Sequence, residues 1–268
     1  ATAYQLSKRN AGKILLLDGN EIASQASARA ACLLTRARTK PALMELVQET
    51  YDCIKEIGVL RDESLELQQC GSVTIASSDS SLKGLEALEE AATRFGIPNE
   101  RISRERVKEL LPWIESDAVD VALYMPTDAF IDSALLCSGY ARAAAKLGVE
   151  LKPNCKVKEI IVEQDEIRGV SLVNGERLNA PIVVNAAGSW ANLLMRPLKI
   201  GLPFTPVRSH FWITDIDNKR FPAGHPFTVI PDARAFTRSD VGALFIGLRE
   251  SQCQAFDPST MTDKLEDF

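Results

Sequence analysis

The feature that most constrains the fold is an apolar run that breaks into small residues at 183–191, with the sequence Val-Val-Asn-Ala-Ala-Gly-Ser-Trp-Ala. It predicts a strand over Ile182–Asn185, a turn, and a helix capped by Ser189, because serine oxygens accept hydrogen bonds from the first free amides of a helix. Small side chains in such a turn let the backbone approach a bulky ligand closely. The pattern therefore favours an α/β protein that binds its ligand at a strand end.

A related phrase opens the chain. Residues 1–18 predict a helix, a turn at Gly12 and a buried apolar strand that ends in Asp18. In a dinucleotide-binding βαβ unit, such an acid binds a ribose hydroxyl pair, and small residues such as Ala3 pack the helix on the sheet, with Leu6 as its buried anchor. This spacing places the last glycine of a G-x-G-x-x-G turn about two residues before the first residue. We expect a fragment that begins inside this fingerprint; an ordinary helix–strand pair is the alternative.

Composition narrows the class of ligand. The net charge of the 268 residues is −5, and Arg36, Arg38 and Lys40 form only a short basic cluster, so a nucleic-acid partner is not expected. The six cysteines form no C-x-x-C pair, which argues against a zinc site or a disulfide framework and favours a cytoplasmic location, although a targeting segment ahead of the fragment stays open. No apolar run approaches the roughly 20 residues of a membrane helix. No feature indicates the oligomeric state.

The rest of the chain alternates helices with short strands. Helices are predicted over Pro41–Ile57, from the polar turn Ser77–Ser81 to about Phe95, over Ser103–Leu111, and over Ala134–Leu147 with Asp132 or Ser133 as its cap. Strands are predicted as two short pieces around Gly71 within Leu65–Ala76, and over Val119–Met125, Val149–Leu151, Cys155–Val162, Gly169–Val173, Arg177–Asn179, Val207–Thr214, Phe227–Ile230, Ala235–Arg238 and Ala243–Leu248. The Asn174-Gly175 pair predicts a hairpin turn.

Three of these phrases together resemble a known family. The opening phrase, the loop at 23–34 (Ala-Ser-Gln-Ala-Ser-Ala-Arg-Ala-Ala-Cys-Leu-Leu) and the phrase at 184–190 occur in the order and spacing of the FAD-dependent D-amino-acid oxidase superfamily, whose sarcosine and dimethylglycine branch is most similar. Residues 128–132 resemble its D-G-x-(I/V)-D turn, with Ala129 in place of glycine. The resemblance implies oxidation of a secondary or tertiary amine, such as an N-methylated glycine, by hydride transfer to flavin. Oxygen or an electron carrier would accept the electrons.

The resemblance also implies a fold and a division into domains. The expected fold is mixed α/β, with a Rossmann-like FAD-binding domain and a discontinuous antiparallel-sheet substrate domain. Residues 1–64 and 133–200 would form the FAD-binding domain, and residues 65–132 and 201–268 the substrate domain. The first strand with its glycine-rich turn, and a C-terminal segment with a further flavin-contacting loop, would lie outside the chain.

Contacts to the cofactor follow from the same resemblance. Asp18 would bind the adenosine ribose, the backbone of Val157 would hold the adenine, and Arg29 would offset phosphate charge. Arg29 stands where some branches carry a histidine that links the flavin, so FAD is expected to be noncovalent at this loop. Cys32 replaces the usual glycine and would be strained at a positive φ. The residues expected to contact FAD are Asp18, Ser27, Arg29, Ala30, Ala31, Val157, Ala186, Ala187, Gly188 and Trp190. A capping acid and a plain strand valine are the alternatives for Asp18 and Val157.

Two kinds of side chain would act on the substrate. A guanidinium suits a carboxylate because it can donate two parallel hydrogen bonds, and the candidates are Arg36, Arg38, Arg238 and Arg249. Arg238 lies in a Phe-x-Arg phrase that resembles the family's Tyr-x-Arg strand, with Phe236 in place of tyrosine. His210 resembles the His-x-aromatic strand of the dimethylglycine branch, and a neutral imidazole could accept a proton from the amine. Solvated arginines and a core histidine are the alternatives.

A second class of function stays open. Some members of the superfamily keep the fold as a structural, assembly or regulatory subunit, and Phe236 and Cys32 favour that interpretation. Another flavin reaction on the same scaffold, such as 2-hydroxy-acid oxidation, would differ only in the substrate pocket. The sequence indicates no metal site, and the absence of a G-x-S-x-G phrase argues against Ser-His-Asp hydrolysis.

Overall fold

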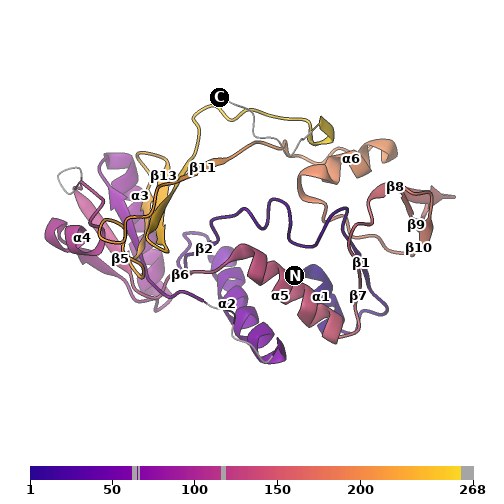
Figure 1. Cartoon of the computed structure of the whole chain (residues 1–268), viewed down its shortest axis with the longest axis horizontal. Helices are drawn as coiled ribbons and strands as arrows, with labels where there is room; N and C mark the ends of the chain where they lie inside the picture. Colours follow the sequence, from indigo (N-terminus) through magenta and orange to yellow (C-terminus); the bar gives the residue numbers. More distant parts are fainter. Residues whose placement is uncertain (62–64, 66, 116–118, 261–268) are drawn as a thin grey trace.

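A computed structural model describes residues 1–61, 65, 67–115 and 119–260. The molecule is elongated, with a large sheet at one end and a small group of strands at the other (Figure 1). Helices α2 (Pro41–Arg61) and α5 (Ser133–Lys146) lie between them. Among the described residues, no helix has both the length and the apolar character needed to span a membrane.

The helix α1 (Thr2–Lys8) and the strand β1 (Leu15–Leu17) form the predicted opening phrase. β1 pairs in parallel with β7 (Glu150–Lys152). Tyr4 is fully buried and packs with Ile57 and Ala144, whereas Leu6 is only half-buried, so the predicted anchor of α1 was wrong. β1 is also half-buried rather than buried, because within the described residues it has a neighbouring strand on one edge only.

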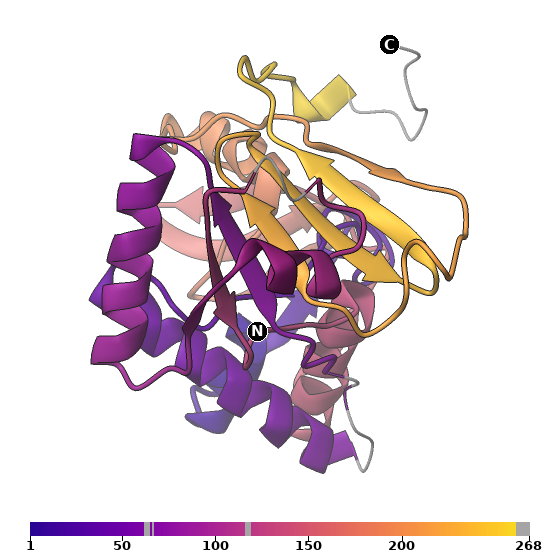
Figure 2. The same cartoon turned by 90° about the vertical axis from the view of Figure 1, so that its left-hand side faces the viewer.

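The large sheet has seven strands in the order β11-β14-β13-β12-β3-β5-β4. They are β11 (His210–Ile213), β14 (Ala243–Leu248), β13 (Ala235–Asp240), β12 (Phe227–Ile230), β3 (Ser72–Ala76), β5 (Val121–Met125) and β4 (Glu100–Ile102). β12 runs parallel to β3, and every other neighbouring pair is antiparallel. The long strands near the C-terminus lie side by side in Figure 2, with α4 in front of them.

A helix covers each face of this sheet. On the α3 face, Ala76, Leu123 and Met125 pack with Leu85 of α3 (Asp79–Arg94). On the α4 face, the opposite one, Val73, Ile75 and Ala122 pack with residues of α4 (Arg104–Leu110). Successive side chains in a strand point to opposite faces, so strand register assigns every sheet residue to one of these two faces.

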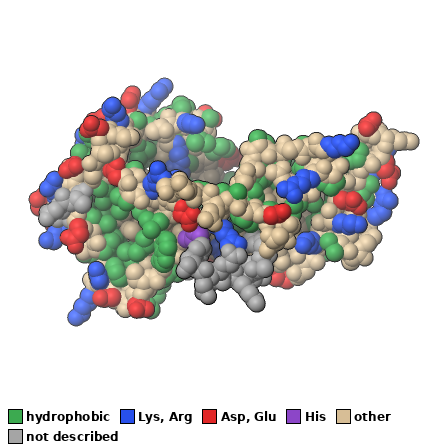
Figure 3. Space-filling view, turned by 90° about the horizontal axis from the view of Figure 1, so that it is seen from above, with side chains coloured by type: hydrophobic (Ala, Val, Ile, Leu, Met, Phe, Trp, Pro, Cys, Tyr) green, Lys and Arg blue, Asp and Glu red, His purple; other side chains and the backbone are tan. Residues whose placement is uncertain are grey.

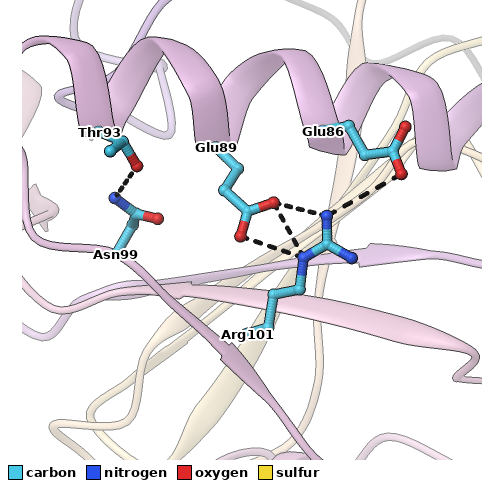
Figure 4. Close-up of polar contacts among 5 residues, drawn as sticks. All are labelled: Glu86, Glu89, Thr93, Asn99 and Arg101. Carbon is cyan, nitrogen blue, oxygen red and sulfur yellow. Dashed lines mark hydrogen bonds and ion pairs between the residues drawn. The ribbon is translucent and has the colours of Figure 1, made fainter.

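Polar contacts fix α3 on the sheet at its N-terminus and further along its length. Ser78, which lies in the polar turn predicted to start the helix, caps it, and Asp232 accepts hydrogen bonds from the hydroxyls of Ser78 (2.6 Å) and Ser81 (2.7 Å). Further along the helix, Arg101 of β4 donates to Glu89 at 2.6 Å and lies 4.0 Å from Glu86 (Figure 4). β4 itself was not predicted.

The small group of strands at the other end is a meander. β8 (Val157–Glu163), β9 (Glu166–Leu172) and β10 (Arg177–Asn179) pair in the order β10-β9-β8. The predicted Asn174-Gly175 turn is confirmed, because the Gly175 amide donates to the Leu172 carbonyl at 3.0 Å between two antiparallel strands. The shorter elements are β2 (Leu33–Leu34), β6 (Ala129–Phe130), η2 (Gly188–Trp190), α6 (Ala191–Met195), η3 (Arg196–Leu198) and η4 (Pro258–Thr260).

The segment at 182–191 differs from its prediction. Ile182–Asn185 forms no strand, because no described strand lies beside it, and the side chains of Ile182 and Val184 are 78% and 57% exposed. Ser189 caps no helix. The Asn185 side chain instead bridges the turn: its NH₂ group donates to the Ala191 carbonyl at 3.0 Å and its Oδ1 accepts from the Ala187 amide at 3.3 Å.

Two other strand predictions were too long. Within Leu65–Ala76 only β3 is a strand, and Gln68 forms an isolated bridge with Phe130; Glu66 lies outside the described residues. Of Val207–Thr214, the strand begins at His210. β11 is an edge strand, and its side chains Trp212 and Ile213 are 52% and 63% exposed. Figure 3 shows hydrophobic side chains on the surface of the part that contains the large sheet.

Candidate functional site

Arg238 joins the large sheet to the loop at 23–34. Its Nη1 donates to the Ala31 carbonyl at 3.4 Å, and its guanidinium lies over the Phe130 ring, 4.4 Å from the centroid. The Phe245 ring lies 5.4 Å away from the same guanidinium. Aromatic faces attract a cation through their quadrupole, so these rings hold the guanidinium in place. Two residues predicted for different roles, one for the substrate and one for the cofactor, therefore meet in space.

Aromatic side chains surround Arg238 on the α3 face. Phe236 lies two residues away on β13, and register places Phe211 and Phe245 on the same face. The Phe211 and Phe245 rings stack at 4.4 Å between centroids, and Phe236 and Phe245 at 5.9 Å. Phe236 lies directly over Gly247, where an added Cβ would be 2.0 Å from the ring. The predicted Phe-x-Arg phrase thus presents both of its side chains to one side of the sheet.

His210 lies on the other face. It pairs with Leu248, and Leu248 pairs with Ala235, so alternation assigns His210 to the α4 face. Its Nδ1 is 2.8 Å from Oε1 of Glu250, and its side chain is 25% exposed. The structure therefore does not bring His210 and Arg238, the predicted proton acceptor and the predicted carboxylate ligand, to the same side.

Asp128 connects the loop to the sheet from a fully buried position. Its Oδ1 accepts from the Arg36 amide at 2.7 Å, and its Oδ2 accepts from the Ser72 hydroxyl at 2.6 Å. Burial raises the pKa of this carboxyl, and the hydrogen bonds from Ser72 and Arg36 oppose that rise. Sequence reasoning noticed the turn that contains Asp128 but did not include the residue in the site. The signal was present: an acid in the short turn that follows a buried strand, after Pro126 and Thr127.

Arg36 is engaged by its own surroundings. Its Nε donates to the Thr127 carbonyl at 3.1 Å, and its guanidinium stacks on Tyr51 at 3.8 Å from the ring centroid. The Tyr51 hydroxyl in turn donates to the Leu34 carbonyl at 2.7 Å. Arg36 is therefore neither a solvated surface arginine nor directed at an open cavity, but packs the turn before β6 against α2.

A cavity of about 450 Å³ opens beside Asp128. It lies between the α3 face of the sheet, helix α3 and the segment at 35–39, and Arg38 is the arginine that lines it. Arg38 donates from Nη1 to the Ala37 carbonyl at 2.9 Å. The other residues that line the cavity are Thr35, Ala37, Thr39, Ser72, Thr74, Ser80, Ser81, Gly84, Leu85, Leu88, Met125, Asp128, Val229, Pro231 and Asp232. Ser72 and Arg238 lie on the same face two strands apart, about 10 Å by the usual strand spacing.

Arg249 lies away from this cavity. It is exposed, follows β14 directly, and its amide donates to the Arg234 carbonyl at 2.9 Å. The neighbouring Leu248 pairs with Ala235, three residues before Arg238, which corresponds to about 10 Å along the strand. The four candidate arginines thus divide: Arg38 and Arg238 face the α3 side, Arg36 is packed, and Arg249 lies at the end of the sheet.

Residues predicted to bind the adenosine lie together at the other end of the molecule. The Cys155 amide donates to the Asp18 carbonyl at 2.7 Å, which places the start of β8 and Val157 beside the end of β1. Asp18 also accepts from the Asn20 amide at 3.0 Å. One hydrophobic cluster is contacted by Leu17, Val157 and Val183. The turn at Ala186–Gly188, which follows Val183, therefore begins close to Asp18 and Val157. Trp190, after the turn, donates from its indole to the Pro258 carbonyl at 3.1 Å.

The loop at 23–34 connects the two ends. It runs from β1 to β2 across the middle of the molecule (Figure 1), and Ser27, Arg29 and Ala30 are exposed along it. The Ser133 hydroxyl donates to the Ala30 carbonyl at 3.2 Å. Cys32, which stands in place of the family's glycine, has a φ of 49° and therefore adopts the left-handed conformation that strains a residue with a Cβ.

No group of three or more His, Cys, Asp or Glu side chains suited to a metal ion occurs within the described residues. The polar groups gathered here are instead a cation, a buried carboxylate, backbone carbonyls and hydroxyls. This arrangement can orient an anionic organic molecule against the loop at 23–34.

Comparisons with known proteins identify related sequences. Mouse mitochondrial sarcosine dehydrogenase is 28% identical over 256 residues, which cover 92% of this chain and 27% of the relative. The mouse mitochondrial pyruvate dehydrogenase phosphatase regulatory subunit is 25% identical over 251 residues, covering 92% of this chain and 28% of the relative. The chain thus spans little more than a quarter of the length of these two relatives.

Solved structures and a family model complete the comparison. L-proline dehydrogenase from P. horikoshii superposes with a TM-score of 0.80 at 23% identity, covering 92% of this chain and 65% of that chain. This likeness confirms the predicted mixed α/β fold. The model of the family described as FAD dependent oxidoreductase (DAO) matches residues 1–268. Since that match covers every residue of the chain, the protein belongs to the family of FAD dependent oxidoreductases.

Proposed function

We propose that this chain provides the FAD-binding and substrate-binding parts of an enzyme that oxidises the C–N bond of a secondary or tertiary amine or amino acid of the sarcosine type. The observation that carries the proposal is the contact between Arg238 and Ala31, which brings the substrate sheet to the proposed flavin loop. The similarity to a sarcosine dehydrogenase supports an N-methylated substrate.

The residues present fit FAD. An acid at the end of β1, Asp18, has a backbone that is fixed by Cys155, which suits a ribose hydroxyl pair. Arg29 is exposed and forms no ion pair within the described part of the chain, so it is available to a diphosphate. Gly188, at a φ of 52°, has no atom within 4 Å of an added Cβ and leaves room for a close approach. We propose noncovalent binding at this loop, because an arginine occupies the linking position.

The proposed domains follow the same division. Residues 1–64 and 133–200 contain β1, β7, the meander and the proposed cofactor contacts, and residues 65–132 and 201–268 contain all strands of the large sheet. Asp128 forms a contact across this division, since it accepts hydrogen bonds from Arg36 of the first part and from Ser72 of the second.

The chain's own side chains would orient the substrate. The Arg238 guanidinium, held over Phe130 beside the proposed flavin loop, would bind the substrate carboxylate. Arg38, which lines the cavity, is the alternative carboxylate ligand. When bound, FAD supplies the hydride acceptor, and the protein supplies orientation and electrostatics. Apolar surroundings such as Phe245 exclude water from the α3 face. His210 is left out of this arrangement because it lies on the opposite face.

The test is an anaerobic visible spectrum of the full-length protein before and after addition of sarcosine, dimethylglycine and a panel of amino acids. Bleaching of the flavin bands by an N-methyl amine is the expected result. Arg238→Ala and Arg38→Ala should slow the bleaching, whereas Arg142→Ala, an exposed arginine of α5, should not. Oxygen consumption in a parallel aerobic reaction distinguishes oxygen from an electron carrier as acceptor. Flavin that no amine bleaches would refute the proposal.

A second candidate is a non-catalytic subunit that keeps the flavoprotein fold. The similarity to a phosphatase regulatory subunit favours it, as do Phe236, which lacks a hydroxyl, and the left-handed Cys32. A protein that retains flavin, or has lost it, and yet is inert to every amine in the panel would support this candidate.

A further inference from the structure

Three arginines line a second cleft, of about 490 Å³, at one end of the large sheet. They come from separate segments: Arg208 precedes β11, Arg234 precedes β13, and Arg249 follows β14. Val207 and Leu248 form apolar walls beside them. The volume is in the range of small-molecule sites. None of the three residues lines the cavity beside Asp128.

The backbone holds two of these cations next to each other. The Arg249 amide donates to the Arg234 carbonyl at 2.9 Å, and the Arg234 amide closes a turn onto the Pro231 carbonyl at 3.0 Å. Arg234 has a φ of 51°, a left-handed conformation that residues with a Cβ rarely adopt. The turn is therefore strained at Arg234. The Arg234 side chain lines the cleft beside that of Arg249.

The cleft carries an excess of positive charge. Arg234 and Arg249 form no ion pair among the residues that the structure describes. Glu250, the acid among the lining residues, is engaged by His210 at 2.8 Å. Arg208 lies over the Phe256 ring, 5.7 Å from the centroid. Like charges that are held together repel each other. The basic cleft also contrasts with the chain as a whole, whose net charge is −5.

We propose that this cleft binds a small anion with two or more charged oxygens, in the form of a phosphoryl group or a dicarboxylate. Two adjacent guanidiniums offer paired, parallel donors to such oxygens, and an anion would relieve their mutual repulsion. The proposal does not depend on amine oxidation, because binding can be measured without flavin or substrate turnover.

The test is isothermal titration calorimetry of the protein with inorganic phosphate and, separately, with malonate, at low ionic strength. Saturable binding is expected for at least one of them, weakened by added salt. Arg249→Ala should reduce affinity about tenfold or more, and Arg249→Lys less, since it keeps the charge but not the planar donors. Arg234→Gly should lose binding to the same extent while keeping the turn, because glycine adopts a positive φ without strain. Arg142→Ala is the control for removal of an exposed arginine.

The outcomes distinguish a phosphoryl ligand from a dicarboxylate and decide whether the proposal holds. Binding of phosphate alone assigns a phosphoryl ligand, and binding of malonate alone assigns a dicarboxylate. Absence of saturable binding to both overturns the proposal. So does binding that Arg234→Gly and Arg249→Ala leave unchanged, provided that circular dichroism shows both variants to be folded.

Discussion

Replacement of Asp128 tests whether one buried carboxylate joins the two parts of the molecule. Asp128→Ala removes the acceptor of the Arg36 amide (2.7 Å) and of the Ser72 hydroxyl (2.6 Å) and leaves both donors without that partner. Hydrogen bonds to a charged group contribute about 1.5–3 kcal/mol each, and the carboxylate's own desolvation, visible in its raised pKa, offsets part of the sum. We expect a loss of about 3–5 kcal/mol in the free energy of unfolding.

Asp128→Asn is the matched variant. Its amide oxygen can accept from the Arg36 amide, and its NH₂ group can donate to the Ser72 oxygen, so the loss should be about 1 kcal/mol or less at neutral pH. Because the pKa of Asp128 is raised on folding, its contribution to stability is greatest below the unfolded pKa of about 3.9 and falls as the pH rises through the folded value. The advantage of aspartate over asparagine should therefore shrink as the pH rises.

The assay is urea unfolding followed by circular dichroism, at several pH values from about 4 upward. The reasoning would be refuted if the alanine and asparagine variants unfolded at the same urea concentration. A difference between wild type and Asp128→Asn that grew with pH would refute the assigned direction of the pKa shift.

Three further predictions concern individual residues. Cys32→Gly should stabilise the protein by about 1 kcal/mol, because glycine relieves the left-handed strain at a φ of 49°; thermal unfolding measures this, and a lower Tm would contradict it. Gly247→Ala should destabilise by about 1–3 kcal/mol, because the new Cβ would meet the Phe236 ring at 2.0 Å, and the loss should shrink in a Phe236→Ala background. Hydrogen bonds from Ser78, Ser81 and the Ser77 amide lower the pKa of Asp232, so the destabilisation caused by Asp232→Asn should be full above pH 4 and disappear as the pH falls through the folded pKa. Unfolding curves of wild type and Asp232→Asn that stay equally far apart at low pH would count against this assignment.

Elements with strong local signals could be predicted from the sequence. The cap of α3, Ser78, lies in the predicted polar turn, and Asp132, one of two predicted candidates, caps α5. β12 and β14 begin and end where the pattern placed them. Such features depend on residues within one turn of a helix or one stretch of strand. Ile182–Asn185 had an equally good strand pattern, but a strand also needs a partner, and no described strand lies beside this segment.

The candidate site was harder to predict for the same reason. The family resemblance pointed to Arg238 and Ala31 separately, but their contact depends on the packing of a sheet against a loop distant in sequence. His210 and Arg238 lie on opposite faces of the sheet because of the register of β11 with β14 and of β14 with β13. The residues next to each of them in sequence contain no information about that register. Asp128 acts through donors from two other segments, and neither donor can be found from its neighbours in the sequence.

The parallel pairing of β12 with β3 also affects how the chain is assembled. Residues 72–76 leave the ribosome long before residues 227–230, so for much of synthesis β3 has a free edge where its later partner will bind. Contacts between residues so far apart in sequence slow folding, and an open apolar strand edge is a site of aggregation. Stalled or shortened translation products that end before residue 227 should therefore be poorly soluble and depend on chaperones, whereas products that extend past β14 can complete the sheet.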